Sequence, residues 1–335
     1  MHSPDFQNQP ELCPWCFDGG LQPKAQKIAF STMSFGFVIL SHRAEDWDLL
    51  ARLLPRLREL GDVEIVLHHD TYQSPADLSL VKRYGVRLLP PVRQTRWSHI
   101  SKVFAIIRGL ECLFRLPKPP RWYATLSPTC YPIKPASVIA NRLNQLTADF
   151  YVDMRRVDFQ SSGIELDKHV EDAVARRTIG VIPFISRRGQ FYWRPLRVRR
   201  PRAVIPFGEN FRLYHGSDWF VLGQRAVAYL LNLNVWEHPV VQFYLTAYPQ
   251  NRSQAPSPVE TVIQSLLGNA SQLRGQYRNW HYIDWRGTTD WHPRLLTEQH
   301  WPELLESDAL WARKLDVERS ARLRQLLDTH ILGKE

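Results

Sequence analysis

Two short apolar runs joined by a helical pattern constrain the fold more than any other feature of the sequence. Phe37-Val-Ile-Leu40 and Val63-Glu-Ile-Val-Leu67 have the length of buried strands, and residues 46–60 between them place leucines at helical spacing. This unit predicts two parallel strands connected by a crossover helix. Ligands bind beyond the carboxyl ends of such strands, which is where His42 and Asp70 fall.

Further strands and helices of the same kind follow along the chain. Additional strands are expected at residues 86–89, 122–126, 150–153 and 214–222, and additional helices begin near residues 98, 225, 257 and 317. This order predicts an α/β fold with a mixed, mostly parallel sheet flanked by helices. We expect one domain over residues 31–335, with two halves that meet near residue 150, and a mobile, polar tail over residues 1–30.

The composition excludes several classes of protein. Of the 335 residues 44% are hydrophobic, enough for a large core, yet no run of about 18 uncharged apolar residues is present to span a membrane. Residues 1–26 lack the basic start and apolar run of a secretory signal, so a cytoplasmic location is expected. Four cysteines are too few for a disulfide framework, and Cys13 and Cys16 lack a second Cys/His pair, so no metal site is expected.

Much of the net charge of +10 falls in one segment. Between residues 187 and 202 stand seven arginines, with Phe191, Tyr192 and Trp193 among them: Arg187, Arg188, Arg194, Arg197, Arg199, Arg200 and Arg202. We expect a long loop or insertion that covers a cleft. Three roles stay open: a solvated loop that keeps the protein soluble, contact with an anionic acceptor or membrane surface, and stacking against nucleic acid.

Ser257-Pro-Val-Glu260 stands immediately before the apolar positions of a late helix. The pattern is that of a capping box, with Ser257 as the N-cap, Pro258 as the first helical residue and the Glu260 carboxylate accepting from the Ser257 amide. A carboxylate at a helix start also stays ionised beside the helix dipole, where it can accept a proton. Glu260 is therefore either a structural cap or a general base.

A series of motifs extends from about residue 35 to residue 332. The motifs are residues 37–42, 66–70, 97–105, 126–134, 216–222, 257–260, 282–285, 292–293 and 312–316. In this order, and with these gaps, they resemble the core-2/I-branching glycosyltransferases, the family that also contains the peptide O-xylosyltransferases (glycosyltransferase family 14). The resemblance implies a GT-A-type domain whose first half, to about residue 150, binds the nucleotide and whose second half binds the acceptor.

The resemblance also implies a reaction. A sugar, N-acetylglucosamine or xylose, is transferred from a UDP donor to a hydroxyl of a glycan, a lipid-linked intermediate or a small molecule, with inversion and without a metal or other cofactor. The resemblance makes Glu260 the base that deprotonates the acceptor, and it places acceptor contacts at Gly216, Asp218 and Trp219.

The donor diphosphate needs positive charge nearby. The strand ending His68-His69-Asp70 lacks the Asp-x-Asp pair that holds a divalent ion in most GT-A enzymes. The resemblance assigns the charge to Lys314, with Arg278 as the nearest candidate for an assisting arginine. One contact at roughly 4 Å contributes on the order of 4 kcal/mol of attraction before desolvation. The alternative for Lys314 is a surface lysine beside Asp316.

Three further residues are expected on the nucleotide side. Asp70 accepts hydrogen bonds from the ribose or the base, unless it caps a helix or forms a turn. His42 contacts the base through its backbone, unless it is a turn residue. Trp97 stacks on the uracil or on a sugar, unless it is part of the core.

One motif departs from the family pattern. The acid that precedes Pro-Ile-Lys in the family is replaced here by Cys130 or Tyr131. Recognition of the donor sugar or the acceptor is therefore expected to differ from the transfer of N-acetylglucosamine to a 6-hydroxyl. The alternative function is a non-catalytic glycan- or nucleic-acid-binding protein that uses residues 187–202. For the enzyme, nucleic acid is not an expected partner.

Overall fold

The computed structural model describes residues 34–90, 95, 99–157, 174–185, 191–201, 204–247, 257–288 and 292–332. Contacts divide the chain into two units, Met1–Thr32 and Met33–Glu335, and every feature below belongs to the second. The tail expected over residues 1–30, with Cys13 and Cys16, lies outside the described residues, as does Trp97.

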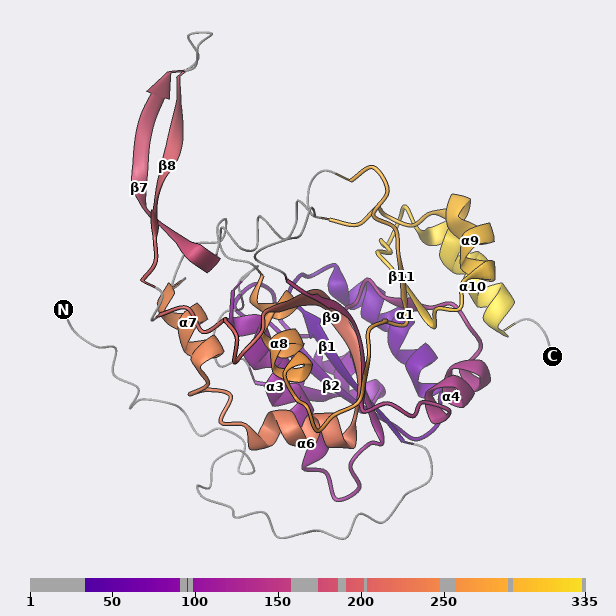
Figure 1. Cartoon of the computed structure of the whole chain (residues 1–335). Coiled ribbons are helices and arrows are strands. Elements are labelled where there is room, and N and C mark those ends of the chain that lie inside the picture. Colours follow the sequence, from indigo (N-terminus) through magenta and orange to yellow (C-terminus); the bar gives the residue numbers. More distant parts are fainter. Residues whose placement is uncertain are drawn as a thin grey trace. The chain divides into compact units, whose positions relative to one another are not determined.

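A seven-stranded sheet forms the centre of this unit (Figure 1). Its strands, in the order in which they lie, are β10 (Gly275–Gln276), β6 (Phe150–Arg156), β9 (Tyr214–Gly223), β4 (Trp122–Leu126), β1 (Phe35–Ser41), β2 (Val63–His69) and β3 (Arg87–Leu89). β1 is parallel to β2 and β4, β2 to β3, and β6 to β10, whereas β9 is antiparallel to both of its neighbours. The predicted mixed, mostly parallel sheet is confirmed.

Helices cover both faces of the sheet. Those described are α1 (Asp46–Arg58), α2 (Leu78–Arg83), α3 (Ser101–Phe114), α4 (Ala136–Asn144), α6 (Gln224–Asn232), α7 (Pro239–Ala247), α8 (Val262–Gly268), α9 (Trp301–Glu306) and α10 (Ala321–Leu332). Val38 packs in one core with α3, α6 and α8, whereas Phe37 and Ile39 pack in another with α1 and α4. Neighbouring residues of one strand therefore face opposite layers, as the strand period of two requires.

A second sheet stands beside the carboxyl end of β4. Its strands are β11 (His281–Ile283), β12 (Trp311–Arg313) and β5 (Tyr131–Pro132), with β12 parallel to β11 and antiparallel to β5. The Leu315 amide donates to the Thr129 carbonyl oxygen at 2.9 Å. The residues after β12 therefore return to the edge where β4 ends, which brings C-terminal motifs to the large sheet.

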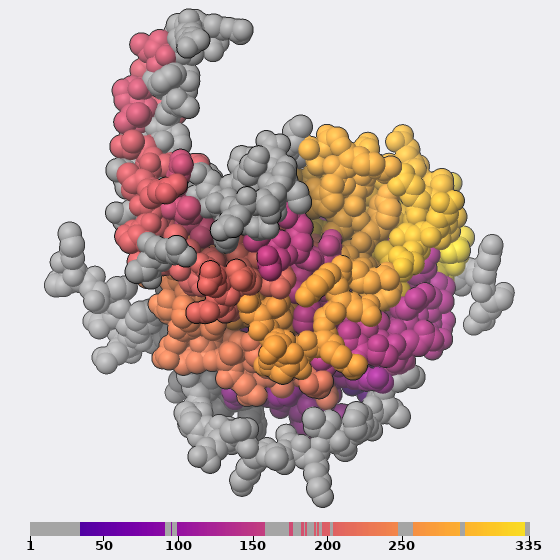
Figure 2. All heavy atoms as spheres, viewed as in Figure 1, coloured from indigo at the N-terminus to yellow at the C-terminus, as the bar shows by residue number. Residues whose placement is uncertain are grey.

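A hairpin stands where the sequence predicts a long loop. β7 (Arg176–Ile185) pairs antiparallel with β8 (Phe191–Arg199), and neither pairs with a strand of the large sheet. The loop prediction is wrong for residues 191–199, because the aromatic and branched residues there suit extended backbone. The hairpin extends away from the sheet in Figure 1, and its red spheres stand clear of the orange and purple ones in Figure 2.

The strand order changes direction at β1. β2 lies on one side of β1 and β4 on the other, so the crossovers diverge and the carboxyl ends of β1 and β4 lie side by side. Open α/β sheets bind ligands at such a point. β9 reaches the same edge, because it pairs with β4 only over residues 221–223 and its earlier residues pass the end of β4.

Gly216 of β9 provides a test of this packing. It lies opposite Met154 of β6 at a shift in register, and an added Cβ would come within 2.2 Å of the Asp153 carbonyl oxygen. We expect Gly216→Ala to lower the free energy of unfolding by about 1–3 kcal/mol in urea denaturation. Gly208→Ala is the control, since nothing lies within 4 Å of a Cβ there. Equal stability of the two variants would show that packing does not explain Gly216.

Candidate functional site

The Thr125 hydroxyl fixes the point at which β9 separates from β4. It donates to the Asp218 carbonyl oxygen at 2.7 Å and accepts from the Phe220 amide at 3.1 Å. Thr125 is fully buried, so these hydrogen bonds have no competition from water. The side chain continues the ladder beyond its last backbone pair, and it holds Asp218 at the carboxyl edge of the sheet.

Charged side chains gather around Asp218. The half-buried carboxyl interacts electrostatically with Lys102 at the start of α3, with Arg313 at the end of β12 and with Glu260. Burial raises the pKa of the Asp218 carboxyl, the two cations oppose the rise, and the charge of Glu260 adds to it. The structure thus brings together two predicted residues, Glu260 and Asp218, with two cations that the sequence analysis does not select.

Glu260 does not complete a capping box. Ser257 makes no side-chain cap hydrogen bond, and residues 258–260 form a 3₁₀ turn, η2, after which α8 starts at Val262. The Ser257 carbonyl oxygen accepts from the Glu260 amide and from the Thr261 hydroxyl, both at 3.0 Å. The backbone therefore turns before the α-helix begins, and the predicted cap is wrong.

The Glu260 side chain faces β9 instead. Its Oε2 lies 3.5 Å from His215 Nε2, and the side chain is 41% exposed. Gln264 anchors the turn, because its Nε2 donates to the carbonyl oxygens of Ser217 at 2.7 Å and Val259 at 2.8 Å. Glu260 is therefore a carboxylate on a fixed backbone with access to solvent, as a general base requires.

Arg313 lies on a column of aromatic rings. Its guanidinium carbon is 4.2 Å from the centre of the Trp219 ring, and its buried Nε has no hydrogen-bond partner. His281 lies 5.9 Å from Trp219 and stacks on Trp311 at 5.5 Å between ring centres. Burial and the charge of Arg313 lower the pKa of His281 to about 3, so the imidazole is neutral. Trp219, predicted to contact the acceptor, is buried and supports Arg313.

Asp70 organises the turn after β2. The buried carboxylate accepts from the Tyr72 amide (3.1 Å), Gln73 Nε2 (2.6 Å), and the Thr95 amide (2.8 Å) and hydroxyl (2.7 Å). Burial by itself raises the pKa of the Asp70 carboxyl, but these hydrogen bonds outweigh it and the pKa is lowered. Asp70 thus forms the turn that the sequence analysis gave as the alternative to a nucleotide contact.

His42 follows β1 at the same edge. Its amide donates to Asp46 Oδ2 at 2.8 Å, and its ring is 45% exposed. Burial lowers the pKa of the imidazole, Asp46 opposes the change, and Arg43 and Lys102 add to it. Lys102 thus acts electrostatically on both His42, after β1, and Asp218 of β9.

The structure does not bring Arg278 to Lys314. In the parallel pair β11–β12, His281 faces Trp311, so Arg278 lies before one end of the pair and Lys314 follows the other end. Arg278 forms an ion pair with Asp308 at 2.6 Å, and Asp308 also precedes β12. The role of Arg278 as the arginine that assists Lys314 stays a prediction, and in this structure Arg278 is paired with Asp308.

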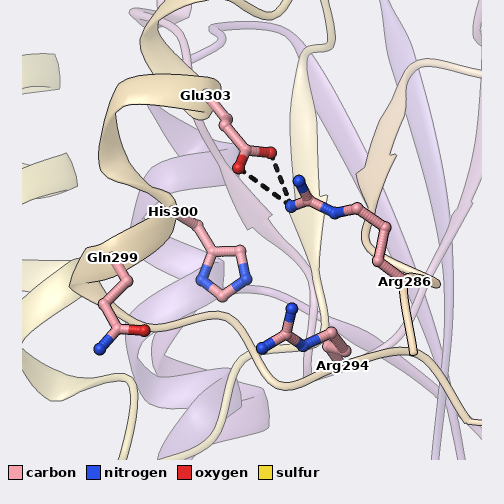
Figure 3. A pocket seen from close by; sticks show the side chains of 5 residues that line it. All are labelled: Arg286, Arg294, Gln299, His300 and Glu303. Atoms are coloured by element: carbon pink, nitrogen blue, oxygen red, sulfur yellow. Dashed lines mark hydrogen bonds and ion pairs between the residues drawn. The ribbon is translucent and has the colours of Figure 1, made fainter. Parts of the chain in front are cut away.

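A pocket of about 250 Å³ is formed by residues that follow β11 (Figure 3). The residues that line it are Arg286, Arg294, Gln299, His300 and Glu303. The Leu296 amide donates to the Lys314 carbonyl oxygen at 2.9 Å, which joins this segment to the chain after β12. Arg286 and Arg294 bring two guanidinium groups to the pocket, and Glu303 brings one carboxylate.

Asp284 interacts with three of the side chains that line this pocket. The buried carboxylate accepts from Arg286 Nε at 2.8 Å and contacts His300 Nε2 at 3.2 Å, and Arg294 Nη1 is 3.6 Å away. The hydrogen bonds from Arg286 hold the pKa of the Asp284 carboxyl far below its usual range. Arg286 also pairs with Glu303 at 2.8 Å. The Arg294 guanidinium therefore lies farther from these carboxylates than the Arg286 guanidinium does.

Sequence reasoning misses Lys102, Arg313 and Arg294. Lys102 and Arg313 both stand inside motifs quoted above, and Arg313 is the immediate neighbour of Lys314. Arg294 follows the His-Pro motif directly. The signal in the sequence is that each of these three cations stands within or directly beside a family motif. The sequence does not show which of its many arginines and lysines lie at the carboxyl edge of the sheet, because that depends on the fold.

Comparison with known proteins identifies the class of enzyme. An α/β sheet with carboxylates and cations at its switch point, in a sequence that matches a transferase family, defines a glycosyltransferase. The match is to the family model described as Core-2/I-Branching enzyme, over residues 61–308. The chain belongs to this family, as its motifs predict.

Two relatives come from Arabidopsis thaliana. The beta-glucuronosyltransferase GlcAT14B is 22% identical over 291 residues, which are 82% of this chain and 62% of that protein. The beta-glucuronosyltransferase GlcAT14A is 23% identical over 196 residues, which are 58% of this chain and 39% of that protein. The chain thus spans less than two thirds of the length of either relative.

Solved structures of similar architecture are distant. 4-Diphosphocytidyl-2C-methyl-D-erythritol synthase from Anaerococcus prevotii is 10% identical with a TM-score of 0.34, over 73% of this chain and 86% of that one. TarS of S. aureus, residues 1–349, is 10% identical with a TM-score of 0.32, over 64% of this chain and 55% of that one. Within the described ranges no helix has the length and apolarity to cross a bilayer.

The raised pKa of Asp218 predicts a dependence of stability on pH. The unfolded carboxyl ionises at a lower pH than the folded one, so ionisation favours unfolding above the ordinary range of aspartate. We expect Asp218→Asn to raise the melting temperature at neutral pH, and we expect the gain to shrink as the pH falls through that range. Thermal melts at several pH values measure it. A gain that is the same at every pH would contradict the raised pKa.

Proposed function

We propose that the protein transfers a sugar from a UDP donor to an acceptor hydroxyl with inversion and without a metal ion. The observation that carries the proposal is the convergence of Glu260, Asp218, Lys102 and Arg313 at the carboxyl edge of the sheet. Membership of the Core-2/I-Branching family makes glycosyl transfer the reaction, and these groups supply the proton acceptor and positive charge that it needs.

Glu260 is proposed as the base. An acceptor hydroxyl that attacks the anomeric carbon must lose its proton, and the new C–O bond forms as the bond to UDP breaks on the opposite face. The fixed η2 backbone and the partial exposure of the Glu260 carboxylate support this role. Asp218 is the second carboxylate, and we assign it to the acceptor hydroxyls beside the one that reacts.

Lys314 and Arg294 are proposed to neutralise the diphosphate as it leaves. The Leu296–Lys314 hydrogen bond joins the segment of Arg294 to Lys314, whereas Arg278 stands at the other end of β11 and β12. The 3.6 Å contact of Arg294 with Asp284 leaves its guanidinium able to donate to phosphate oxygens. Two cations can provide the charge that a divalent ion provides elsewhere.

The donor sugar is proposed from three candidates. N-acetylglucosamine and xylose follow from the family, and glucuronic acid is added because both relatives are named beta-glucuronosyltransferases. The acceptor is proposed to be a hydroxyl of a glycan, a lipid-linked intermediate or a small molecule. A panel of UDP-sugars, scored by hydrolysis of the donor, separates the three candidates.

Replacement of the base tests the proton step. We expect Glu260→Gln to keep the melting temperature and the affinity for UDP but to lower kcat by about 10²–10⁴-fold, because the amide cannot accept the proton. Glu237→Gln, at an exposed position of the same chain, is the control and should retain kcat. If Asp218→Asn lowers kcat far more than Glu260→Gln does, the base is Asp218 and the assignment of Glu260 is wrong.

A pair of arginine variants tests the diphosphate site. We expect Arg294→Gln to weaken UDP binding by about tenfold or more, because a charge-assisted hydrogen bond to phosphate is lost. Arg278→Gln is a matched control, since Arg278 is also paired with an aspartate and is 41% exposed against 50% for Arg294. Calorimetry with UDP measures both, with and without EDTA. Loss of UDP binding in EDTA would contradict metal independence.

A further inference from the structure

The hairpin β7–β8 exposes an apolar surface that the proposed reaction does not use. Its exposed large apolar side chains, as fractions of full exposure, are Ile182 (43%), Ile185 (65%), Phe191 (60%), Trp193 (60%) and Leu196 (40%). Ile185 is paired with Phe191, and Trp193 lies two residues after Phe191 on the same face of the hairpin. Phe191 and Trp193 pack edge to face at 5.5 Å between ring centres. Ile185, Phe191 and Trp193 share one face of the hairpin, and Ile182 and Leu196 lie on the other. The five side chains together are here called the apolar end of the hairpin.

The same segment accounts for most of the net positive charge of the chain. Residues 174–201 contain eight arginines and no aspartate, glutamate, lysine or histidine: Arg176, Arg177, Arg187, Arg188, Arg194, Arg197, Arg199 and Arg200. The net charge of the whole chain is +10. The side chains of Arg176, Arg197 and Arg199 are exposed on the half of the hairpin farther from the apolar end. Arg176, Arg197 and Arg199 thus follow the apolar end, whereas Arg194 is paired with Ile182 within it, and Arg187 and Arg188 stand in the sequence between Ile185 and Phe191.

We propose that the hairpin docks on a membrane surface that contains anionic lipids. Trp, Phe and Leu side chains accompanied by arginines are the composition of segments that lie in the bilayer interface, where the apolar groups enter to about 5–10 Å. The paired run from Ile182 to Ile185 rises about 10 Å, which matches that depth. The arginines then face lipid phosphates, whose charge is opposite to theirs.

Aliphatic side chains favour a membrane over nucleic acid as the occupant. Bases stack on aromatic rings and on guanidinium groups, which would use Phe191 and Trp193. Ile182, Ile185 and Leu196 offer no such face, yet all three are exposed, and Ile185 is as exposed as the two aromatic residues. Hydrocarbon accepts both kinds of side chain.

Vesicle binding by the full chain tests the proposal. We expect cosedimentation with phosphatidylcholine vesicles that contain phosphatidylserine, weak binding to phosphatidylcholine alone, and weakening by salt. The double variant Phe191→Ser/Trp193→Ser should bind about tenfold more weakly or worse. Arg197→Gln/Arg199→Gln should lose about fivefold for each arginine replaced.

A matched control distinguishes docking through the hairpin from nonspecific binding through any exposed apolar side chain. Ile185→Ser should weaken binding, whereas Leu78→Ser on α2 should not, because both positions are 65% exposed but only Ile185 belongs to the hairpin. Melting temperature and transfer to a soluble acceptor should be unchanged in all of these variants. No binding to anionic vesicles, or equal binding by the hairpin variants and Leu78→Ser, would overturn the proposal. Binding to a single-stranded oligonucleotide or self-association in place of vesicle binding would also overturn it.

Discussion

The hydroxyl of Thr125 fixes the position of β9 relative to β4 at the carboxyl edge of the large sheet. β4 and β9 run in opposite directions and part after Ala124, and at that point one buried side chain replaces the next pair of backbone hydrogen bonds. Without it, the Asp218 carbonyl would need another partner in a dry environment, which costs free energy. The antiparallel strand thus passes the end of a parallel one at a fixed height.

Charge is balanced at this edge by groups from four different parts of the chain. Asp218 comes from β9, Glu260 from η2, Lys102 from α3 and Arg313 from β12. Two carboxylates near one another repel, and the two cations offset part of that repulsion. The pocket beside Asp284 also pairs opposite charges, because Arg286 and Arg294 stand there with the carboxylates of Asp284 and Glu303.

The layers of the fold were accessible from sequence, whereas the partners within the site were not. Buried strands such as Trp122–Leu126 appear where the apolar runs predict them, since a strand period and its end are local properties. The many arginines of residues 187–202 favour a loop prediction. The aromatic and branched residues among them, which suit a strand, carry the opposite signal. The predicted capping box is wrong for a different reason. The Glu260 amide donates to the Ser257 carbonyl oxygen and closes a 3₁₀ turn, and the four-residue pattern Ser-Pro-Val-Glu does not distinguish that turn from the first turn of an α-helix. Arg278 is the nearest candidate arginine upstream of Lys314 in the sequence. The register of β11 and β12, which a sequence does not reveal, places the two residues beyond opposite ends of the strand pair.

The stacked column under Arg313 has a consequence for how activity responds to acidity. His281 stays uncharged until the medium is far more acidic than a cell, because burial and then the charge of Arg313 lower the pKa of its imidazole. The two rings beside it have no proton to exchange, so the support of the guanidinium is the same from mildly acidic to alkaline solution. Any bell shape in the rate of transfer over that range must therefore originate in other groups, and the arginine itself stays in place throughout.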